Sequence, residues 1–391
     1  MSGCIFRKVA VGTISMTTSK APKQKKPLFE DVANTYEEEL LTGVLQSITS
    51  GRTEYVAVGI DMAAQEGNWG LSVITIDQQL NRGALRLLLP HRFDLKGFKR
   101  KRPIKPSAGF IAQLVRGLAD HRITAAVAVD VPFGWPKEHS SFLEDWSAVS
   151  ALGREISIPS RCCFEYRLCD RAMMGLLKFE GRSAAVLAVG ADKIASAAFQ
   201  WATQRIGMPG FERVDLGYES TMVDRAVCFE TYPSAFVRLN YPSFAGYKTL
   251  KDSTAEDEPA QAKLTERQVR HDLLDAIRGD YQIDAGPCAN ALEAACATST
   301  SDAFDGFLSA ITAWDYLKWR TQPAGTLRMS SPTELLGTHG AATQESRIQK
   351  EGWFLVRLPV GSAFSAVEEG ELFAADENSS FVEKTNHFAK H

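Results

Sequence analysis

Two carboxylates, Asp302 and Asp305, stand three residues apart in the segment TSTSDAFDGFLSAITAWDYL (298–317). The segment opens in hydroxyl residues and then turns apolar, which predicts a single helix. At this spacing both carboxylates share one face of the helix. The same face continues through small residues: Gly306, Ser309 and Ala313. It would pack closely against another element and carry two negative charges to the contact.

Helix capping is the alternative explanation of these charges. Acidic residues in the first turn offset the helix dipole, and Ser299 with Asp302 fits the S/T-x-x-D/E capping pattern. The helix alone does not separate the two explanations, so the rest of the chain has to decide.

Two further aspartates end apolar segments that resemble buried strands: Asp61 in TEYVAVGIDMAA (53–64) and Asp130 in ITAAVAVDVPFGW (123–135). A buried charge is costly unless it is paired or bound to a metal. Ligand sites of open α/β sheets lie outside the carboxyl ends of the strands. If the two strands are neighbours, Asp61 and Asp130 lie side by side, where the helix of the other two acids can reach them.

Four carboxylates gathered in this way favour one kind of chemistry. Like charges raise one another's pKa unless a cation neutralises them, and oxygen ligands suit a hard dication such as Mg²⁺ or Mn²⁺. Two dications about 3.5–4 Å apart clamp a phosphodiester for in-line attack by water. We therefore favour a shared acidic site over capping. Its expected catalytic and metal-binding residues are Asp61, Asp130, Asp302 and Asp305.

The elements that must position these residues alternate between strands and helices. The predicted order is strands at 53–64, 69–77 and 84–94, a helix at 107–122, strands at 123–135 and 225–233, helices at 264–279 and 298–317, and an edge strand at 351–359. The first three strands follow at short spacing, which favours antiparallel hairpins. The strand at 123–135 is apolar almost throughout, as expected for burial on both faces of a sheet.

The fold class predicted from this order is α/β, with a mixed sheet flanked by helices. The chain has 391 residues, 45% of them hydrophobic and 23% charged, which is an ordinary globular composition. The predicted organisation is an N-terminal extension (1–50), partly disordered, a main domain (51–360) with a helical insertion (136–224), and a C-terminal tail (361–391).

Charge and cysteine content exclude several function classes. A net charge of −3 gives no global attraction to nucleic acid or to anionic membranes, so such binding needs a local patch. The seven cysteines include no Cys-x-x-Cys pair, which argues against a zinc site. With no secretory signal they favour a reducing compartment, and we expect the cytoplasm. No apolar run approaches ~18 residues, so no membrane span is expected.

Six segments in series carry a resemblance to a known family. They are GID…W (59–69), VDVPFGWP (129–136), YRLCDRAMMG (166–175), FETYPSAF (229–236), DAFDGFLSAITA (302–313) and EGWFLVRLP (351–359). In this order they resemble the domain-of-unknown-function family 429. The resemblance implies a ribonuclease H-like fold and the nuclease activity that is predicted for that family.

The segment DAFDGFLSAIT also resembles the last helix of Holliday-junction resolvases, in which two acids three apart bind metal. That similarity implies Asp302 and Asp305 as ligands, together with Asp61 and Asp130. The family resemblance further implies Glu230 as a fifth acid, although a buried salt-bridge partner is equally expected there. The chain departs from the family pattern after Asp61, where Met62-Ala63-Ala64-Gln65 replaces a glycine-rich turn, and in its long insertion.

Basic residues supply candidate substrate contacts. Arg167, Asp170 and Arg171 recur at helical spacing, so both arginines point the same way and could grip a phosphate. The alternative is a solvated helix face with an internal ion pair. Lys248 in GYKTLKD is a further candidate phosphate contact.

The segment KGFKRKRPIK (96–105) holds six basic residues in ten and no acid. A nucleic-acid backbone could bind along it through Lys99, Arg100, Lys101 and Arg102. The alternatives are a solvated loop and a nuclear-import-like sequence. Three tryptophans are expected to pack rather than to stack on bases: Trp135, Trp314 and Trp319.

Three functions fit these patterns. The first is a Mg²⁺- or Mn²⁺-dependent phosphodiesterase acting on nucleic acid. The second is a non-catalytic ribonuclease H-like module that binds nucleic acid or a protein partner. The third is an ATP-dependent phosphotransferase of the sugar-kinase and actin type, which shares the topology and the opening G-I-D. The stretch MAAQEG (62–67) offers few of the glycines and hydroxyls that such enzymes use, and no GxxxxGK[ST] motif occurs.

Overall fold

The computed structural model describes the chain in twelve segments. They are residues 29–50, 54–62, 69–89, 109–137, 139–141, 166–182, 196–198, 200–202, 226–248, 260–297, 301–323 and 325–359. Residues 1–28 of the predicted N-terminal extension and the predicted C-terminal tail (361–391) lie outside these segments. So do the basic residues Lys99 to Arg102 and most of the predicted insertion.

A six-stranded mixed sheet forms the centre of the fold, in the order β5-β4-β1-β2-β3-β6. Its strands are β1 (Tyr55–Asp61), β2 (Gly70–Ile76), β3 (Gly83–Leu89), β4 (Thr124–Asp130), β5 (Val227–Glu230) and β6 (Ile283–Asp284). The first three strands pair antiparallel, whereas β4 joins β1, β5 joins β4 and β6 joins β3 in parallel. This arrangement confirms the predicted α/β class and is consistent with a ribonuclease H-like sheet.

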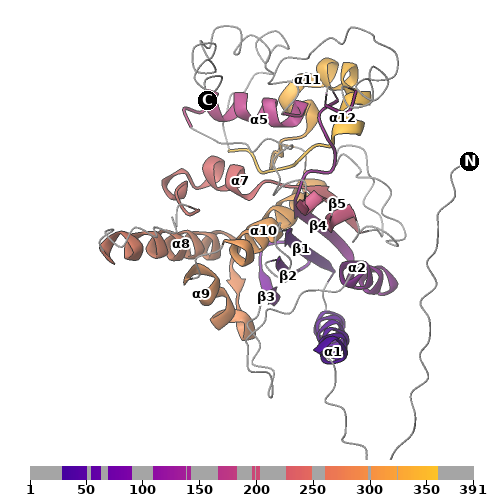
Figure 1. Ribbon diagram of the computed structural model, residues 1–391, viewed down its shortest axis with the longest axis vertical. Helices are drawn as coiled ribbons and strands as arrows, with labels where there is room; N and C mark the ends of the chain where they lie inside the picture. Colours follow the sequence, from indigo (N-terminus) through magenta and orange to yellow (C-terminus); the bar gives the residue numbers. More distant parts are fainter. Residues whose placement is uncertain are drawn as a thin grey trace, which may run out of the picture.

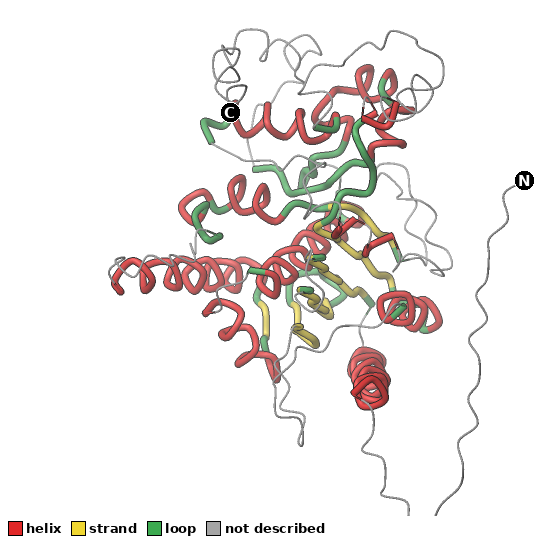
Figure 2. The backbone as a smooth tube through the Cα atoms, in the orientation of Figure 1, coloured by secondary structure: helices red, strands yellow, loops and turns green. Residues whose placement is uncertain are grey.

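Helices lie on both sides of the strands (Figure 2). They are α1 (Phe29–Thr49), α2 (Phe110–Asp120), α5 (Leu168–Phe179), α7 (Pro233–Asn240), α8 (Ala260–Tyr281), α9 (Ala289–Ala297), α10 (Asp302–Thr321), α11 (Pro332–Thr343) and α12 (Glu345–Glu351), with 3₁₀ turns η1 (Pro242–Phe244) and η2 (Gly286–Cys288). Figure 1 shows α1 and α2 together on one side of the sheet, α10 against the strands, and α5, α11 and α12 grouped beyond β4 and β5.

Several boundaries differ from the sequence prediction. Helix α1 falls within the predicted N-terminal extension and packs through Val44 and Ile48, an apolar pair at helical spacing that the sequence reasoning overlooked. Helix α10 begins at Asp302 rather than at residue 298, and its flanking residue Ser301 makes no side-chain capping bond. Ser299, the expected capping residue, lies outside the described segments.

The two faces of the central strands carry side chains of different size. Toward α1 and α2 they present branched residues: Val56, Val58, Ile60, Val127 and Val129. The opposite face carries small residues, which pack with α5, α7, α8 and α10: Ala57, Ala126 and Ala128. Because side chains alternate along a strand, Gly59, Asp61 and Asp130 belong to this second face.

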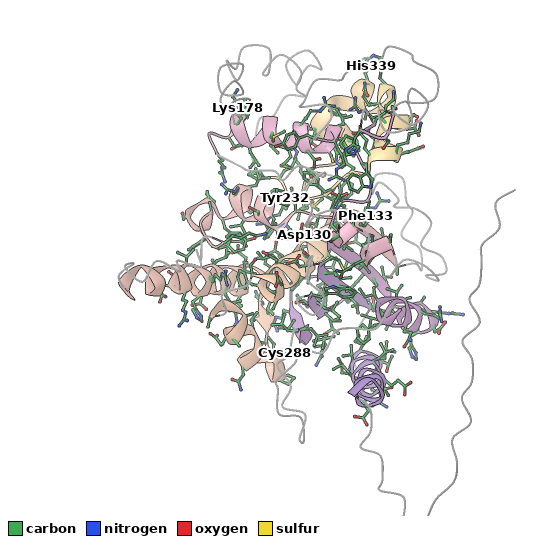
Figure 3. All side chains as sticks on the ribbon, in the orientation of Figure 1. Asp130, Phe133, Lys178, Tyr232, Cys288 and His339 are labelled. Atoms are coloured by element: carbon green, nitrogen blue, oxygen red, sulfur yellow. The ribbon has the colours of Figure 1, made fainter. Side chains whose placement is uncertain are left out.

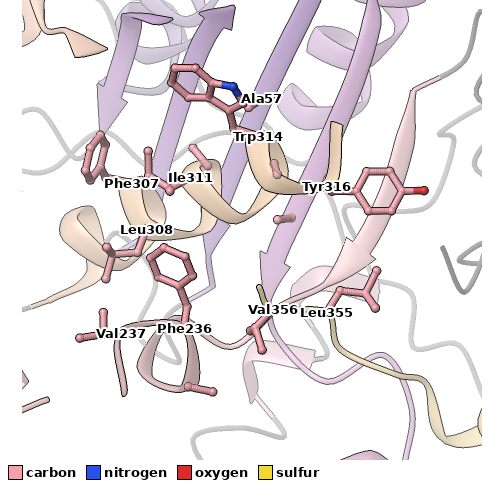
Figure 4. Close-up of a cluster of buried hydrophobic side chains, with 14 of the residues drawn as sticks. Ala57, Phe236, Val237, Phe307, Leu308, Ile311, Trp314, Tyr316, Leu355 and Val356 are labelled. Atoms are coloured by element: carbon pink, nitrogen blue, oxygen red, sulfur yellow. The ribbon is translucent and has the colours of Figure 1, made fainter. Parts of the chain in front are cut away.

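Helix α10 approaches the second face so closely that backbone contacts backbone. A β-carbon on Gly59 would overlap the main chain of Gly306 and Ala310, and one on Gly70 would overlap the main chain of Asp302. The small helix face expected from Gly306 is therefore confirmed as the packing surface. Figure 4 shows α10 between the strands, marked by Ala57, and α7, marked by Phe236 and Val237.

The edge strand expected at 351–359 is an extended segment with isolated bridges. One bridge joins Glu230 to Phe354 in parallel and another joins Met329 to Arg357. The reason lies in its neighbour, because β5 ends at Glu230 and α7 begins at Pro233. Too little of β5 remains beside the segment for a regular ladder.

Among the helices that the structure describes, none combines the length and the apolar composition needed to cross a bilayer.

Candidate functional site

Asp61 and Asp130 lie side by side at the carboxyl ends of neighbouring parallel strands. They are direct partners in the register of β1 and β4, as expected from the sequence. Both follow small residues on the face that α10 covers, and each is half-buried. The sheet thus places two carboxylates next to each other at its edge, where solvent still reaches them. Figure 3 labels Asp130 in this part of the molecule, near Phe133 and Tyr232.

Helix α10 brings Asp302 and Asp305 to the same edge. The main chain of Asp302 lies against Gly70, and Gly70 pairs with Asp61 across β1 and β2. One turn further, Asp305 is buried, with 1% of its surface exposed. Asp61 therefore stands between Asp130 on one strand and the start of α10 on the other side.

Two residues from the turn after η1 contact the carboxylate oxygens of Asp305. The Tyr247 hydroxyl donates to its Oδ1 at 2.7 Å, and the Lys248 ammonium approaches its Oδ2 to 3.0 Å. Tyr247 is fully buried, and its carbonyl accepts a 2.8 Å bond from Nε of Arg270 on α8. Helix α8 thereby fixes the turn that carries Lys248 into the site, which places the candidate Lys248 among the acids.

Electrostatic repulsion links these acids. Burial, followed by the charges of Asp130, Asp305 and Asp302, raises the pKa of Asp61 well above its usual value, although Lys248 opposes the shift. Burial also raises the pKa of Asp130 to about 7. The charge of Lys248 opposes this shift, and the charge of Asp305 adds to it. Burial alone would lower the pKa of Lys248, but Asp305, Asp130 and Asp61 raise it overall, so its ammonium stays charged.

The donor set fits a hard divalent cation in its chemistry. Its ligands are carboxylates from β1, β4 and α10, with neither imidazole nor thiol among them, and their mutual repulsion would be relieved by added positive charge. Within the described segments, no three His, Cys, Asp or Glu side chains are already gathered in a ligand cage. Cation binding therefore has to draw these carboxylates together and reorganise the contacts of Asp305.

The raised pKa of Asp130 predicts how pH affects the metal-free protein. Its folded pKa of about 7 lies above the usual 3.8, so its contribution to stability is fully present below about pH 4 and is lost as pH rises through about 7. The variant Asp130→Asn has no carboxyl group to ionise at this position, so its stability should not fall in this way as pH rises. In chelator, its melting temperature should exceed that of the wild type, and this difference should grow from pH 5 to pH 8. Each kcal/mol of added stability corresponds to about 2–4 °C in melting temperature. Parallel melting curves for the two proteins across this range would contradict the electrostatic arrangement.

A family model described as "Protein of unknown function (DUF429)" matches residues 59–322. The chain belongs to this family. The match includes all four aspartates and Lys248, and it ends shortly after α10, so α11 and α12 lie beyond it. No match was found among curated proteins or among solved structures.

Glu230, the fifth acid suggested by the resemblance to this DUF429 family, turns away from the four aspartates. It pairs in register with Val129, whose side chain lies on the opposite face from Asp130. Its carboxylate instead accepts two bonds from the guanidinium of Arg167, at 2.7 and 2.5 Å, and one from the backbone amide of Phe133 at 3.0 Å. The salt-bridge alternative therefore describes Glu230.

The structure also places Arg167 and Asp170 in an internal pair. Arg167 donates two bonds to Asp170, two to Glu230 and one to the carbonyl of Glu351, which uses all five N–H groups of a guanidinium. With 3% of its surface exposed, Arg167 has no donor left for a phosphate. Arg171 is buried on the same helix. The expected phosphate grip is thus replaced by an ionic cluster that joins α5, β5 and α12.

Other sequence expectations meet mixed outcomes. Trp314 is buried in the core as expected, and Trp319 is partly buried against it. Trp135, by contrast, is 36% exposed and lies edge-on to His139, because the loop after β4 turns it away from the core. The basic segment 96–105 lies outside the described segments, and so does most of the turn after Asp61.

Sequence reasoning missed two residues with clear roles here. Tyr247 directly precedes Lys248, but a single tyrosine in a turn carries no pattern that points to a buried hydroxyl. Glu351 accepts bonds from the backbone amides of Lys137 and Leu168 and from Nε of Arg347. It is the last residue of the short polar helix α12, and only its position at the start of EGWFLVRLP gave a signal.

Proposed function

We propose that this chain is a divalent-metal-dependent phosphodiesterase that acts on nucleic acid. One observation carries the proposal: Asp61 and Asp130 meet at the ends of neighbouring parallel strands, and α10 brings Asp305 close enough for its charge to act on both. Membership of the DUF429 family is consistent with it but names no activity. The cytoplasmic location that the cysteine content favours is part of the same proposal.

Each acidic residue has an expected task. Asp61, Asp130 and Asp305 would hold Mg²⁺ or Mn²⁺, with Asp302 at the outer side near Gly70. When bound, the cation would supply Lewis acidity at the scissile phosphate. Asp61 and Asp130 are half-buried, so part of each side chain remains accessible from outside. Lys248, 38% exposed in its side chain, lies where it can contact a phosphate oxygen.

The site's own charge explains why a cation is needed. When Asp61, Asp130 and Asp305 are all ionised, they oppose one ammonium, that of Lys248, and a phosphodiester would add a further negative charge. Coulomb repulsion between like charges at a few ångströms amounts to several kcal/mol near a protein surface. Substrate can therefore approach these carboxylates only when positive charge has been added between them.

A non-catalytic binding module is the second candidate, and one observation favours it. The Lys248–Asp305 ion pair neutralises part of the site without any metal, which would suit a fold that is retained for binding alone. Such a module would bind nucleic acid with an affinity that falls with salt but does not depend on Mg²⁺. Turnover in the phosphodiesterase depends on the metal.

The test is a cleavage assay with labelled single- and double-stranded DNA, RNA, hybrids and branched junctions. Each would be incubated with Mg²⁺, with Mn²⁺ and with chelator. We expect cleavage of at least one substrate class with metal and none with chelator. The double variant Asp302→Asn/Asp305→Asn should lose it, because it removes both acids in the first turn of α10.

The control is Asp284→Asn, which neutralises an exposed aspartate of β6 whose carboxylate accepts a bond from the amide of Gly286 in the adjacent turn. This variant should keep full activity. Absence of cleavage on every substrate, together with absence of Mn²⁺ binding by calorimetry, would overturn the phosphodiesterase proposal and leave the binding module.

A further inference from the structure

Both carboxylate oxygens of Asp305 are already engaged. Oδ1 accepts from Tyr247 and Oδ2 pairs with Lys248. A cation that uses Asp305 as a ligand must take at least one of these oxygens. The two contacts differ in how firmly they are held, and this difference decides which one gives way.

The Tyr247 contact is fixed. Its ring is packed near Phe304 of α10, its side chain is buried, and its carbonyl is bonded to Arg270. Moving the hydroxyl would open the core between α8 and α10. A buried hydroxyl that loses its partner also costs free energy.

The Lys248 contact is free to change. The side chain is 38% exposed, so its ammonium can leave Oδ2 for solvent without opening the core. Lysine is a flexible point charge on a four-carbon stem, so the ammonium can move while the buried Asp305 stays in place. Its charge nevertheless reaches Asp61 and Asp130 as well as Asp305.

We propose that Lys248 is the resident counter-ion of the acidic site, and that a divalent cation binds only by displacing its ammonium from Asp305. The inference rests on the proposed metal-dependent function and adds a residue that competes with the metal. An ammonium among these carboxylates lowers the affinity for a dication twice, once by occupying Oδ2 and once by charge repulsion. Lys248 thereby holds the acids together in the metal-free protein and sets the metal concentration at which the site fills.

The experiment is a calorimetric titration of Mn²⁺ into the full-length protein, without nucleic acid. Lys248→Met should bind Mn²⁺ about fivefold more tightly than the wild type, equivalent to roughly 1 kcal/mol. Lys248→Arg keeps the charge and should stay near the wild-type affinity. Lys318→Met is the matched control, because it removes a lysine near buried Asp315 at the other end of α10 and should leave Mn²⁺ binding unchanged.

The outcomes separate this inference from the function on which it rests. In one outcome, Asp61→Asn abolishes Mn²⁺ binding, whereas Lys248→Met binds Mn²⁺ with the wild-type affinity or more weakly. This result would overturn the role of Lys248 and keep the metal site. If Lys248→Met and Lys318→Met both bind Mn²⁺ more tightly, the gain in affinity comes from the change in net charge. This result would also overturn the proposed role of Lys248. No Mn²⁺ binding by the wild type or by Lys248→Met would overturn both the inference and the metal-dependent function.

Discussion

Replacement of Asp61 by asparagine is expected to abolish metal-dependent cleavage and at the same time to make the metal-free protein more stable. Asp61 stands between Asp130 and the start of α10, so its loss removes the central donor of the proposed site. We expect cleavage to fall on the order of a thousandfold or more, which corresponds to roughly 4 kcal/mol of transition-state stabilisation.

The opposite sign for stability follows from the electrostatics. Burial and the neighbouring aspartates raise the pKa of Asp61 well above its usual value, so the folded protein favours an uncharged group at this position. Asparagine has nearly the shape of aspartate and no charge, and thus relieves the repulsion at neutral pH. In chelator, Asp61→Asn should melt a few °C higher than the wild type, at about 2–4 °C per kcal/mol.

Addition of Mn²⁺ should reverse this order, because a ligand stabilises only the protein that binds it. The wild type should gain in melting temperature and Asp61→Asn should not. Asp315→Asn is the control: it neutralises another buried aspartate of α10, bonded to Tyr281 and not to the site, and should keep cleavage. Full cleavage by Asp61→Asn would remove this residue from the site. A lower melting temperature in chelator would show that Asp61 is held by partners rather than repelled.

The order of strands and helices could be predicted because each central element carries a strong local signal. The segments around Asp61 and Asp130 are continuous apolar runs of strand length, and the helix at α2 has apolar residues at regular spacing. Side-by-side placement of Asp61 and Asp130 then needed only one assumption, that the two strands are neighbours. Strand β6, with two residues, and the bridges around Phe354 arise from tertiary contact and leave no periodic signal.

The face of the sheet on which α10 packs is also indicated by the sequence, although the pattern is easy to overlook. In YVAVGID and TAAVAVD, branched residues alternate with alanine and glycine before each aspartate. Such alternation predicts one face with large side chains and one with small ones, and the small face is where a helix can come close. The aspartates continue the small face, so the helix that packs there must meet them.

The ionic cluster around Arg167 could not be predicted in the same way. Its members come from α5, from the end of β5 and from α12, which are far apart in the chain, and no spacing rule connects them. The sequence showed two arginines on one helix face, and phosphate binding and internal pairing explain such a face equally well. Only the fold brings Glu230 to Arg167, whose side chain reaches from the start of α5 to the end of β5.

Replacement of Arg167 by methionine is expected to cost the largest amount of stability. The variant keeps most of the side-chain volume but leaves the carboxylates of Glu230 and Asp170 buried without their cation. Removal of one partner from a buried ion pair costs about 3–5 kcal/mol. At about 2–4 °C per kcal/mol, thermal unfolding should shift downward by roughly 10 °C. Arg328→Met is the matched control, because its pair with Glu334 is about one-third exposed and should contribute at most ~1 kcal/mol.

The pH dependence of the Arg167→Met variant separates charge from packing. Burial raises the pKa of Glu230 even with Arg167 present, and without Arg167 the lowering effect of its charge is lost. Protonation then removes the unpaired charge, so the stability deficit should be smaller at pH 5 than at pH 8. An equal deficit at both pH values would assign the loss to packing.

The loss of Arg167 should also affect the acidic site, because Glu230 accepts a bond from the amide of Phe133, three residues after Asp130. Weaker Mn²⁺ binding in the folded Arg167→Met protein would show that this buried cluster positions the loop after β4, and that α5 and α12 support the site from outside the sheet.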